Sequence, residues 1–342
     1  MRDQKVTIAK GLTILLMVLL HSGSPVGICH YFGMSHMPLF FFMSGYCFKV
    51  SYLTRPWDFV RKKVTGVYGQ FVKWALFFLL IHSLLYKVGF YPEYARGIFY
   101  SSKRYLLEQM YSILVCMQTD EWLLGGYWFL KSLFWGNMLF YGIRWCLRGK
   151  AVWAMLVMLT VGLAFSYLNV TVPYLTITTK DVLAGFYIAF GHWYRQQEYG
   201  WHKRWWVLLG VAVLTYVASV CCYASMNRVS FPTTIPFIAV SCMGCIGLFS
   251  LAYFFDRYVS GWLKRLMVYT GDHTFGILTW HFTCFKLMSM AIIGCAGLEY
   301  ARLAEATILI DYAVRGWYWA YFAVGTALPL AGAWLWERYV KR

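Results

Sequence analysis

The sequence predicts an all-α membrane protein with about ten transmembrane helices and with both termini in the cytoplasm. Of the 342 residues, 60% are apolar and only 13% are charged, and the mean hydropathy is +0.54. A soluble domain carries about 25% charged residues, so this composition indicates a polytopic membrane protein. The net charge of +17 does not indicate nucleic-acid binding, because the basic residues recur in short clusters between apolar runs.

Ten apolar segments follow one another along the chain, which we treat as a single domain over residues 1–342 because no repeat or soluble domain interrupts them. A helix needs about 20 residues to span a bilayer, so the first, second and sixth segments are marginal. Short spans in membrane proteins can line a cavity instead of facing lipid. The segments cover residues 7–21, 38–53, 66–89, 126–145, 151–168, 181–195, 205–225, 233–255, 270–294 and 316–337.

Successive connections between the predicted spans are alternately rich and poor in lysine and arginine. With the N-terminus in the cytoplasm, 19 of the 31 lysines and arginines fall on the cytoplasmic side and 8 on the opposite side. This bias follows the positive-inside rule and supports ten spans. The 19 lie within residues 2–10, 55–63, 144–150, 195–204, 257–265 and 338–342.

Several stretches outside the spans give weaker signals. The polar loops 90–125 and 295–315 are expected on the outer side, either capping a site or as solvated connectors. The N-terminal apolar stretch lacks a small-x-small cleavage site, so we expect it to be retained. Most of the ten cysteines lie in apolar runs and are expected to pack as small hydrophobes. The C-x-x-C at 242–245 has no second pair or nearby histidine, so no metal site is predicted.

Lys10 and His21 lie on one apolar helix, in the stretch KGLTILLMVLLHSG. Eleven positions bring them within about 20° of the same helix face, about 16 Å apart along the axis. A neutral imidazole is the usual general base for a hydroxyl, and a lysine near the cytoplasmic surface can contact a phosphate. Two alternatives stay open: His21 as a hydrogen-bonded residue at a helix end, and Lys10 as a snorkelling anchor.

Two further histidines are candidates. His36 opens the second span, in SHMPLFFFMSG, and the uncharged connector before it allows His36 to approach His21. The FFFMSG run is expected to serve mainly in helix packing. His281 lies within the ninth span, either as a catalytic or donor-contact histidine or as a buried helix–helix hydrogen bond. Asp272 is expected to cap the start of that helix.

Aromatic and basic residues add two more elements. Trp128 opens the fourth span and serves either as an interface anchor or as part of a donor cavity. Lys131, in the same span, must find a partner or line water. Trp57 with the basic cluster Arg61, Lys62 and Lys63 predicts an amphipathic stretch at the cytoplasmic surface.

At these residues the sequence resembles the acyltransferase 3 family of integral membrane acyltransferases. It is most similar to the branch of fucose 4-O-acetylase-like polysaccharide O-acetyltransferases. Three blocks carry the resemblance: Lys10-x10-His21 followed by HMPLFFFMSG at 36–45, WFL at 128–130, and GDHTFGILTWH at 271–281. The chain departs from the family pattern in having Lys10 where arginine is common and Thr7 where an acidic residue is common. Arg61-Lys62-Lys63 replaces two closely spaced arginines, so a particular arginine pairing is lost.

The resemblance implies a membrane O-acyltransferase with acyl-CoA, taken as acetyl-CoA, as donor substrate and with no permanently bound cofactor. His21 and His36 would be catalytic, whereas Trp128, His281, Lys10 and the basic cluster Arg61, Lys62 and Lys63 would contact the donor. The acceptor would be a glycan or lipid-linked sugar at the bacterial inner membrane, and a homo-oligomer stays open. The alternative is a transporter or flippase for a glycan or lipid-linked saccharide, although we see no internal repeat that favours it.

Overall fold

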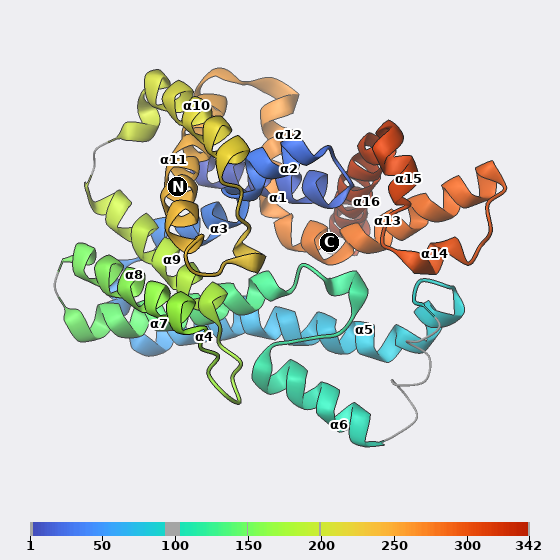
Figure 1. Ribbon diagram of the computed structural model, residues 1–342, viewed down its shortest axis with the longest axis horizontal. Coiled ribbons are helices and arrows are strands. Elements are labelled where there is room, and N and C mark those ends of the chain that lie inside the picture. Colours follow the sequence, from blue (N-terminus) through green and yellow to red (C-terminus); the bar gives the residue numbers. More distant parts are fainter. Residues whose placement is uncertain (1–2, 93–102, 149, 198–199, 341–342) are drawn as a thin grey trace. The chain divides into compact units, whose positions relative to one another are not determined.

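A computed structural model describes residues 3–92, 103–148, 150–197 and 200–340. Within these ranges the regular elements are helices, and the only β pairing is an isolated bridge between Val172 and Ile177 (Figure 1). The predicted all-α class is therefore confirmed. Arg2, Lys341 and Arg342 of the predicted cytoplasmic basic residues, and Glu93 and Arg96 of the predicted loop 90–125, lie outside the described ranges.

Each of the ten predicted apolar segments contains a helix. A short 3₁₀ turn, Val50–Leu53, forms the end of the second segment. The helices are α1 (Gln4–His21), α3 (His36–Tyr46), α5 (Gly69–Lys87), α7 (Trp128–Leu147), α8 (Ala151–Leu168), α9 (Thr179–Gln197), α10 (Trp205–Cys221), α11 (Thr234–Tyr258), α13 (Thr274–Ala296) and α16 (Tyr318–Tyr339).

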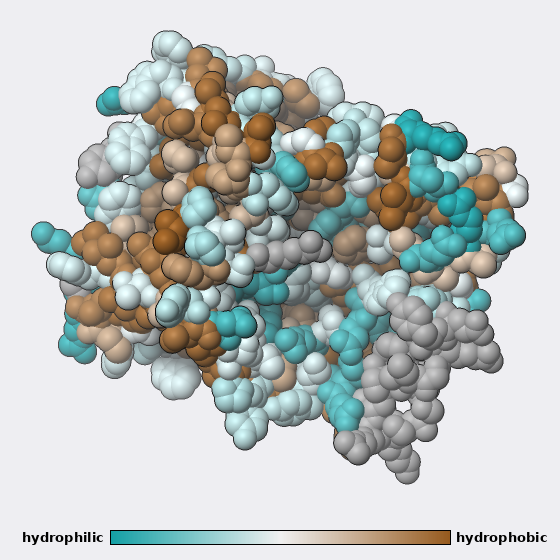
Figure 2. Space-filling view, in the orientation of Figure 1, coloured by the Kyte–Doolittle hydropathy of each residue, from teal (hydrophilic) through white to brown (hydrophobic). Residues whose placement is uncertain are grey.

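Five helical stretches of the described chain are long and apolar enough to cross a membrane: Gln4–His21, Pro56–Lys87, Ala151–Leu168, Thr234–Tyr258 and Thr274–Ala296. Among the other predicted spans, α3 and α10 are too short, with 11 and 17 residues. Helices α7, α9 and α16 are long enough, with 20, 19 and 22 residues, but are not among the helices apolar enough to qualify. Apolar residues nevertheless cover the surface over α8 and α10 (Figure 2).

Further helices lie where the sequence predicted connectors or loops. They are α2 (Val26–Gly33), α4 (Pro56–Lys63), α6 (Lys103–Tyr111), α12 (Gly261–Asp272), α14 (Arg302–Glu305) and α15 (Ile310–Tyr312). The prediction that Asp272 caps α13 is wrong, because Asp272 ends α12 and His273 occupies the N-cap of α13. The loop predicted over 90–125 is helical over Lys103–Cys116, where an α-helix continues into a π-turn.

The chain divides into two compact units, which are described separately. Unit 1 comprises Met1–Leu16, Val26–Tyr68 and Phe129–Asp272. Unit 2 comprises Met17–Pro25, Gly69–Trp128 and His273–Arg342.

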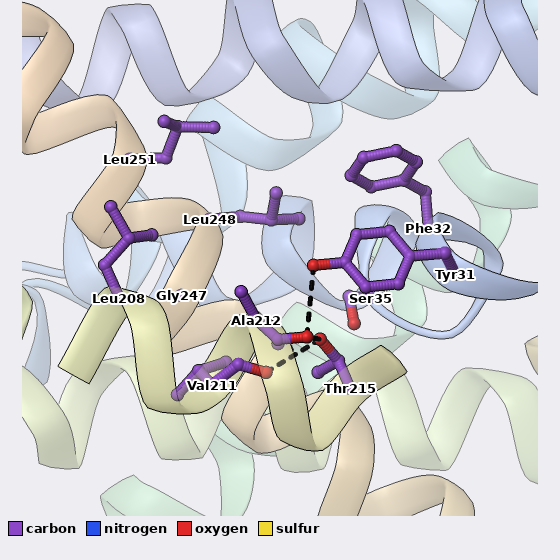
Figure 3. A pocket seen from close by; sticks show the side chains of 11 residues that line it. Tyr31, Phe32, Ser35, Leu208, Val211, Ala212, Thr215, Gly247, Leu248 and Leu251 are labelled. Atoms are coloured by element: carbon purple, nitrogen blue, oxygen red, sulfur yellow. Dashed lines mark hydrogen bonds between the residues drawn. The ribbon is translucent and has the colours of Figure 1, made fainter. Parts of the chain in front are cut away.

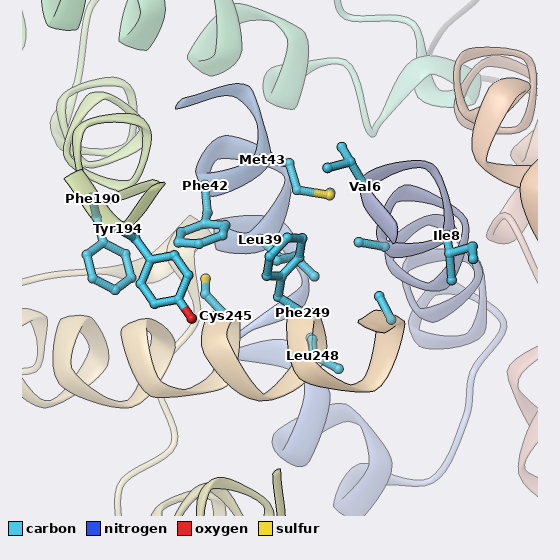
Figure 4. Packing of buried hydrophobic residues seen from close by; sticks show 12 residues of the cluster. Val6, Ile8, Leu39, Phe42, Met43, Phe190, Tyr194, Cys245, Leu248 and Phe249 are labelled. Atoms are coloured by element: carbon cyan, nitrogen blue, oxygen red, sulfur yellow. The ribbon is translucent and has the colours of Figure 1, made fainter. Parts of the chain in front are cut away.

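Unit 1 is built around the close packing of α3 against α9. A Cβ atom at Gly45 would lie 1.7 Å from the Ile188 carbonyl oxygen, and one at Gly191 would lie 2.0 Å from that of Phe42. Only glycine permits backbones to approach this closely. The Phe42 ring lies at the centre of a buried cluster contributed by α1, α3, α9 and α11 (Figure 4). The prediction that FFFMSG serves helix packing is confirmed.

Unit 2 is built around α13 and α16. A Cβ atom at Gly325 of α16 would lie 2.4 Å from Cε1 of Phe285, so a glycine is needed where the helices cross. Lys286 of α13 is fully buried and donates hydrogen bonds to the carbonyl oxygens of Leu303 and Ala306. These bonds tie the segment around α14 to α13.

Candidate active site

The histidine pair, His21 and His281, is the central feature of unit 2. His21 ends α1 and is half-buried, whereas His281 lies within α13 and is fully buried. Nδ1 of His21 lies 3.2 Å from Nε2 of His281, and the rings are nearly parallel, with an interplanar angle of 12°. The structure thus joins two candidates that are 260 positions apart in the sequence.

The hydrogen bonds around His281 determine which nitrogen carries each proton. Nδ1 of His281 lies 3.1 Å and 3.0 Å from the carbonyl oxygens of Ile277 and Leu278. Because a carbonyl oxygen only accepts, Nδ1 of His281 is the protonated nitrogen and its Nε2 carries the lone pair. Nδ1–H of His21 must therefore donate to His281, which leaves the basic lone pair of neutral His21 on Nε2.

The segment that precedes α7 packs against the helix that carries His281. A Cβ atom at Gly126 would lie 3.0 Å from Cδ1 of Leu278 and 3.8 Å from Cε1 of His281. The Tyr127 hydroxyl lies 2.8 Å from the Thr279 hydroxyl on the same helix. Trp128 follows directly as the first residue of α7, so the predicted donor-site tryptophan belongs to the segment that borders the histidine pair.

The predicted basic donor-contact residues, Lys10, Arg61, Lys62 and Lys63, belong to unit 1. Lys63 is half-buried and donates to the Ser44 hydroxyl, 3.1 Å away, and Lys10 of α1 is among its charged neighbours. The Ser44 hydroxyl in turn donates to the Asn137 side-chain oxygen, 3.1 Å away. Lys10 of α1 and Lys63 of α4 are therefore neighbours, and together they are called the lysine cluster. Two lysine ammonium groups together favour an anion.

Two members of the predicted basic cluster face outward, and the second predicted catalytic histidine is hydrogen-bonded to the backbone. Arg61 and Lys62 are exposed on α4, and Lys62 donates to the Tyr52 hydroxyl, 3.2 Å away. His36 opens α3 and its Nδ1 donates to the Phe32 carbonyl oxygen, 2.9 Å away. The approach of His36 to His21 stays a prediction, since the two belong to different units.

The sequence did not predict a buried cluster of Glu121, His82 and Tyr91 in unit 2. Glu121 is 4% exposed, and its carboxylate accepts from the Tyr91 hydroxyl at 2.7 Å and contacts Nδ1 of His82 at 3.1 Å. The His82 and Tyr91 rings stack, with centroids 4.6 Å apart. Glu121 precedes the segment that packs against His281, so this cluster fixes the start of that segment. A histidine within an apolar span was the one signal in the sequence that pointed to it.

A cavity of about 210 Å³ lies in unit 1 among α2, α10 and α11 (Figure 3). Leucines line one part, and the hydroxyls of Tyr31 and Thr215 donate to backbone carbonyls of α10. The Ser35 hydroxyl is buried there and has no hydrogen-bond partner among the residues that the structure describes. None of the predicted site residues lines this cavity.

Apolar helices, a histidine pair with one fully buried member and two neighbouring lysines are parts that a membrane-embedded group-transfer enzyme needs. A sequence profile described as an acyltransferase domain matches residues 3–338. The chain therefore belongs to the acyltransferase 3 family of membrane acyltransferases. Searches of curated proteins and of solved structures gave no match.

Proposed function

We propose that the protein is an O-acyltransferase that moves an acetyl group from cytoplasmic acetyl-CoA to a hydroxyl of a cell-surface glycan or lipid-linked sugar. His21 is the general base. The observation that carries this proposal is the hydrogen bond from Nδ1 of His21 to Nε2 of His281. It leaves the His21 lone pair on Nε2, the nitrogen that must receive the proton.

In the proposed reaction, Nε2 of His21 takes the proton of the acceptor hydroxyl while its oxygen attacks the thioester carbonyl. The tetrahedral intermediate collapses, the carbon–sulfur bond breaks, and the CoA thiolate takes the proton back from His21. The products are the ester and CoA. While His21 is an imidazolium, its Nδ1–H donates a charge-assisted hydrogen bond to His281, which stabilises the transient cation.

The lysine cluster supports the donor side of the proposal. Lys10 and Lys63 offer two lysine side chains to the anionic nucleotide of the donor. Lys10 and His21 both lie on α1, so one helix carries a phosphate contact and the base. In the proposed topology all ten predicted segments span the bacterial inner membrane, both termini are cytoplasmic, and the basic residues follow the positive-inside rule.

The test is transfer of labelled acetyl groups from acetyl-CoA to glycan in membranes that contain the protein. We expect His21→Ala to abolish transfer and His30→Ala to retain it, because the His30 ring instead stacks on Tyr223 in unit 1. Full activity of His21→Ala would overturn the role of His21. Movement of a lipid-linked saccharide by purified protein without any acyl donor would replace the enzyme by a transporter.

A further inference from the structure

Arg144 is a buried arginine, and two of its three guanidinium nitrogens have no acceptor among the described residues. It lies near the end of α7, the residue is 6% exposed, and its Nε and Nη1 atoms have no hydrogen-bond partner within the described ranges. Buried guanidinium nitrogens without acceptors destabilise the folded state. Such a group is expected where a ligand supplies the missing acceptor.

His192 of α9 adds a further buried donor. The Gln196 side-chain nitrogen lies 3.1 Å from Nε2 of His192 and can only donate, so this Nε2 accepts and Nδ1 carries the proton. Nδ1 is buried and has no acceptor among the described residues. The charged neighbours of His192 are Arg144 and Arg195, both cationic. Three buried N–H-bearing nitrogens therefore need acceptors, and no described carboxylate supplies one.

The surroundings suit an anion held away from water. The His192 ring meets the rings of Phe48 and Phe140 at centroid distances of 5.0 Å and 5.6 Å. A charge-assisted hydrogen bond is stronger in such a low-dielectric site than in water. A guanidinium fork matches the geometry of a phosphate.

We propose that Arg144 and His192 bind the oxygens of a phosphate group, either of the nucleotide of an acyl-CoA donor or of an anionic lipid headgroup. The nucleotide source rests on the proposed function, whereas the headgroup source does not. Arg144 follows Asn137 by seven positions, so it lies on the same face of α7 and about 10 Å along the axis. Asn137 is linked through Ser44 to Lys63. A donor with two separated phosphate groups would meet Arg144 with one and Lys63 with the other.

The test compares Arg144→Met with Arg148→Met, which removes an exposed arginine at the end of the same helix. The full chain is placed in nanodiscs of neutral lipid, and thermal unfolding is followed with no addition, with CoA and with 3′-dephospho-CoA. A second set of nanodiscs contains phosphatidylglycerol. Without added anion, we expect Arg144→Met to unfold at or above the wild-type temperature, because it removes an unpaired buried charge.

CoA should stabilise the wild type and Arg148→Met, and its Kd should rise at least about tenfold in Arg144→Met, since a hydrogen bond to a charged group is lost. A weaker effect of 3′-dephospho-CoA would assign Arg144 to the 3′-phosphate. Stabilisation by phosphatidylglycerol that requires Arg144 would identify a headgroup instead. If Arg144→Met unfolds earlier than the wild type in neutral nanodiscs and neither probe distinguishes the two, the proposal is overturned.

Two controls keep this result separate from folding and from the proposed function. If Arg144→Met does not fold, Arg144→Lys keeps the charge without the fork, and unchanged binding of both probes would reject the site. Acetyl transfer with an unchanged KM for acetyl-CoA in Arg144→Met would reject the nucleotide source and leave the proposed function intact. Absence of transfer in the wild type would leave a headgroup site intact.

Discussion

The substitution His281→Phe tests the role assigned to the histidine pair. It removes the acceptor for Nδ1–H of His21 and keeps an aromatic ring beside Phe282 and Phe285, whose centroids lie 4.0 Å and 5.7 Å from that of His281. The carbonyl groups that His281 contacts belong to its own helix and keep their helical hydrogen bonds. The change therefore affects mainly the hydrogen bond to His21.

The size of the effect follows from the state of His21 during the reaction. A hydrogen bond to a charged group is worth about 1.5–3 kcal/mol, and this one forms its charged version only when His21 has taken a proton. Its loss should lower kcat roughly 10- to 100-fold. The KM for acetyl-CoA should stay the same, because no ground-state contact to the donor is removed. Steady-state transfer of labelled acetyl groups in membranes measures both quantities.

The same measurements contain the result that would refute this reasoning. An unchanged kcat with a raised KM would mean that His281 contacts the donor, as the resemblance to the family implied, and not that it supports the base. Thermal unfolding of the purified variant should match the wild type within a few degrees. His30→Phe, which changes a histidine stacked on Tyr223 in unit 1, should leave kcat and KM unaltered.

Three further outcomes are expected. Gly45→Ala should lose about 3 kcal/mol or more of unfolding free energy, because its Cβ would lie 1.7 Å from the Ile188 carbonyl oxygen. Gly142→Ala should lose none, because nothing lies within 4 Å of a Cβ there. Equal unfolding midpoints of the two variants would contradict the close packing of α3 against α9. Burial lowers the pKa of His202 to about 4 in the folded protein. As pH falls from about 6.5 to about 4, the imidazole is protonated in the unfolded chain but not in the folded one, so the unfolding free energy should fall over this range. His202→Phe should flatten that pH profile, and an unchanged profile would speak against His202. Glu121→Gln should lower stability by about 1–3 kcal/mol in thermal unfolding, because the buried donors around it lose a charged acceptor, and a wild-type midpoint would argue against this role.

The sequence predicted the helices of the bundle better than the elements between them. All ten apolar segments are helical because long apolar runs leave the backbone no partner except itself. Helices α2, α6 and α12 were missed for a physical reason. They have 8, 9 and 12 residues and are too short or too polar to be recognised as spans, so packing in the fold stabilises them.

The candidate site was predicted in its parts but not in its assembly. Helical periodicity relates Lys10 to His21, which share α1, but it says nothing about His281, 260 positions beyond His21. Glu121 was assigned to a polar outer loop because charge in a loop usually indicates solvent. In the structure His82 and Tyr91 bind the carboxylate and allow it to be buried. Local pattern gives no information about such tertiary partners.

A buried lysine or arginine in an apolar helical protein points to a function only when no hydrogen-bond acceptor within the protein explains its burial. Lys131 is 5% exposed and donates to the carbonyl and hydroxyl oxygens of Thr176, both at 2.7 Å. Lys286 is fully buried and donates to two loop carbonyls. Both lysines thereby fasten a connecting segment to a helix, so their burial is explained by structure alone. Arg144 was counted among the residues that set the topology, yet it is buried like the two lysines, and its Nε and Nη1 atoms have no acceptor in the part of the chain that the structure describes. An unsatisfied guanidinium costs stability, and a ligand that supplies the acceptor explains why the chain carries it.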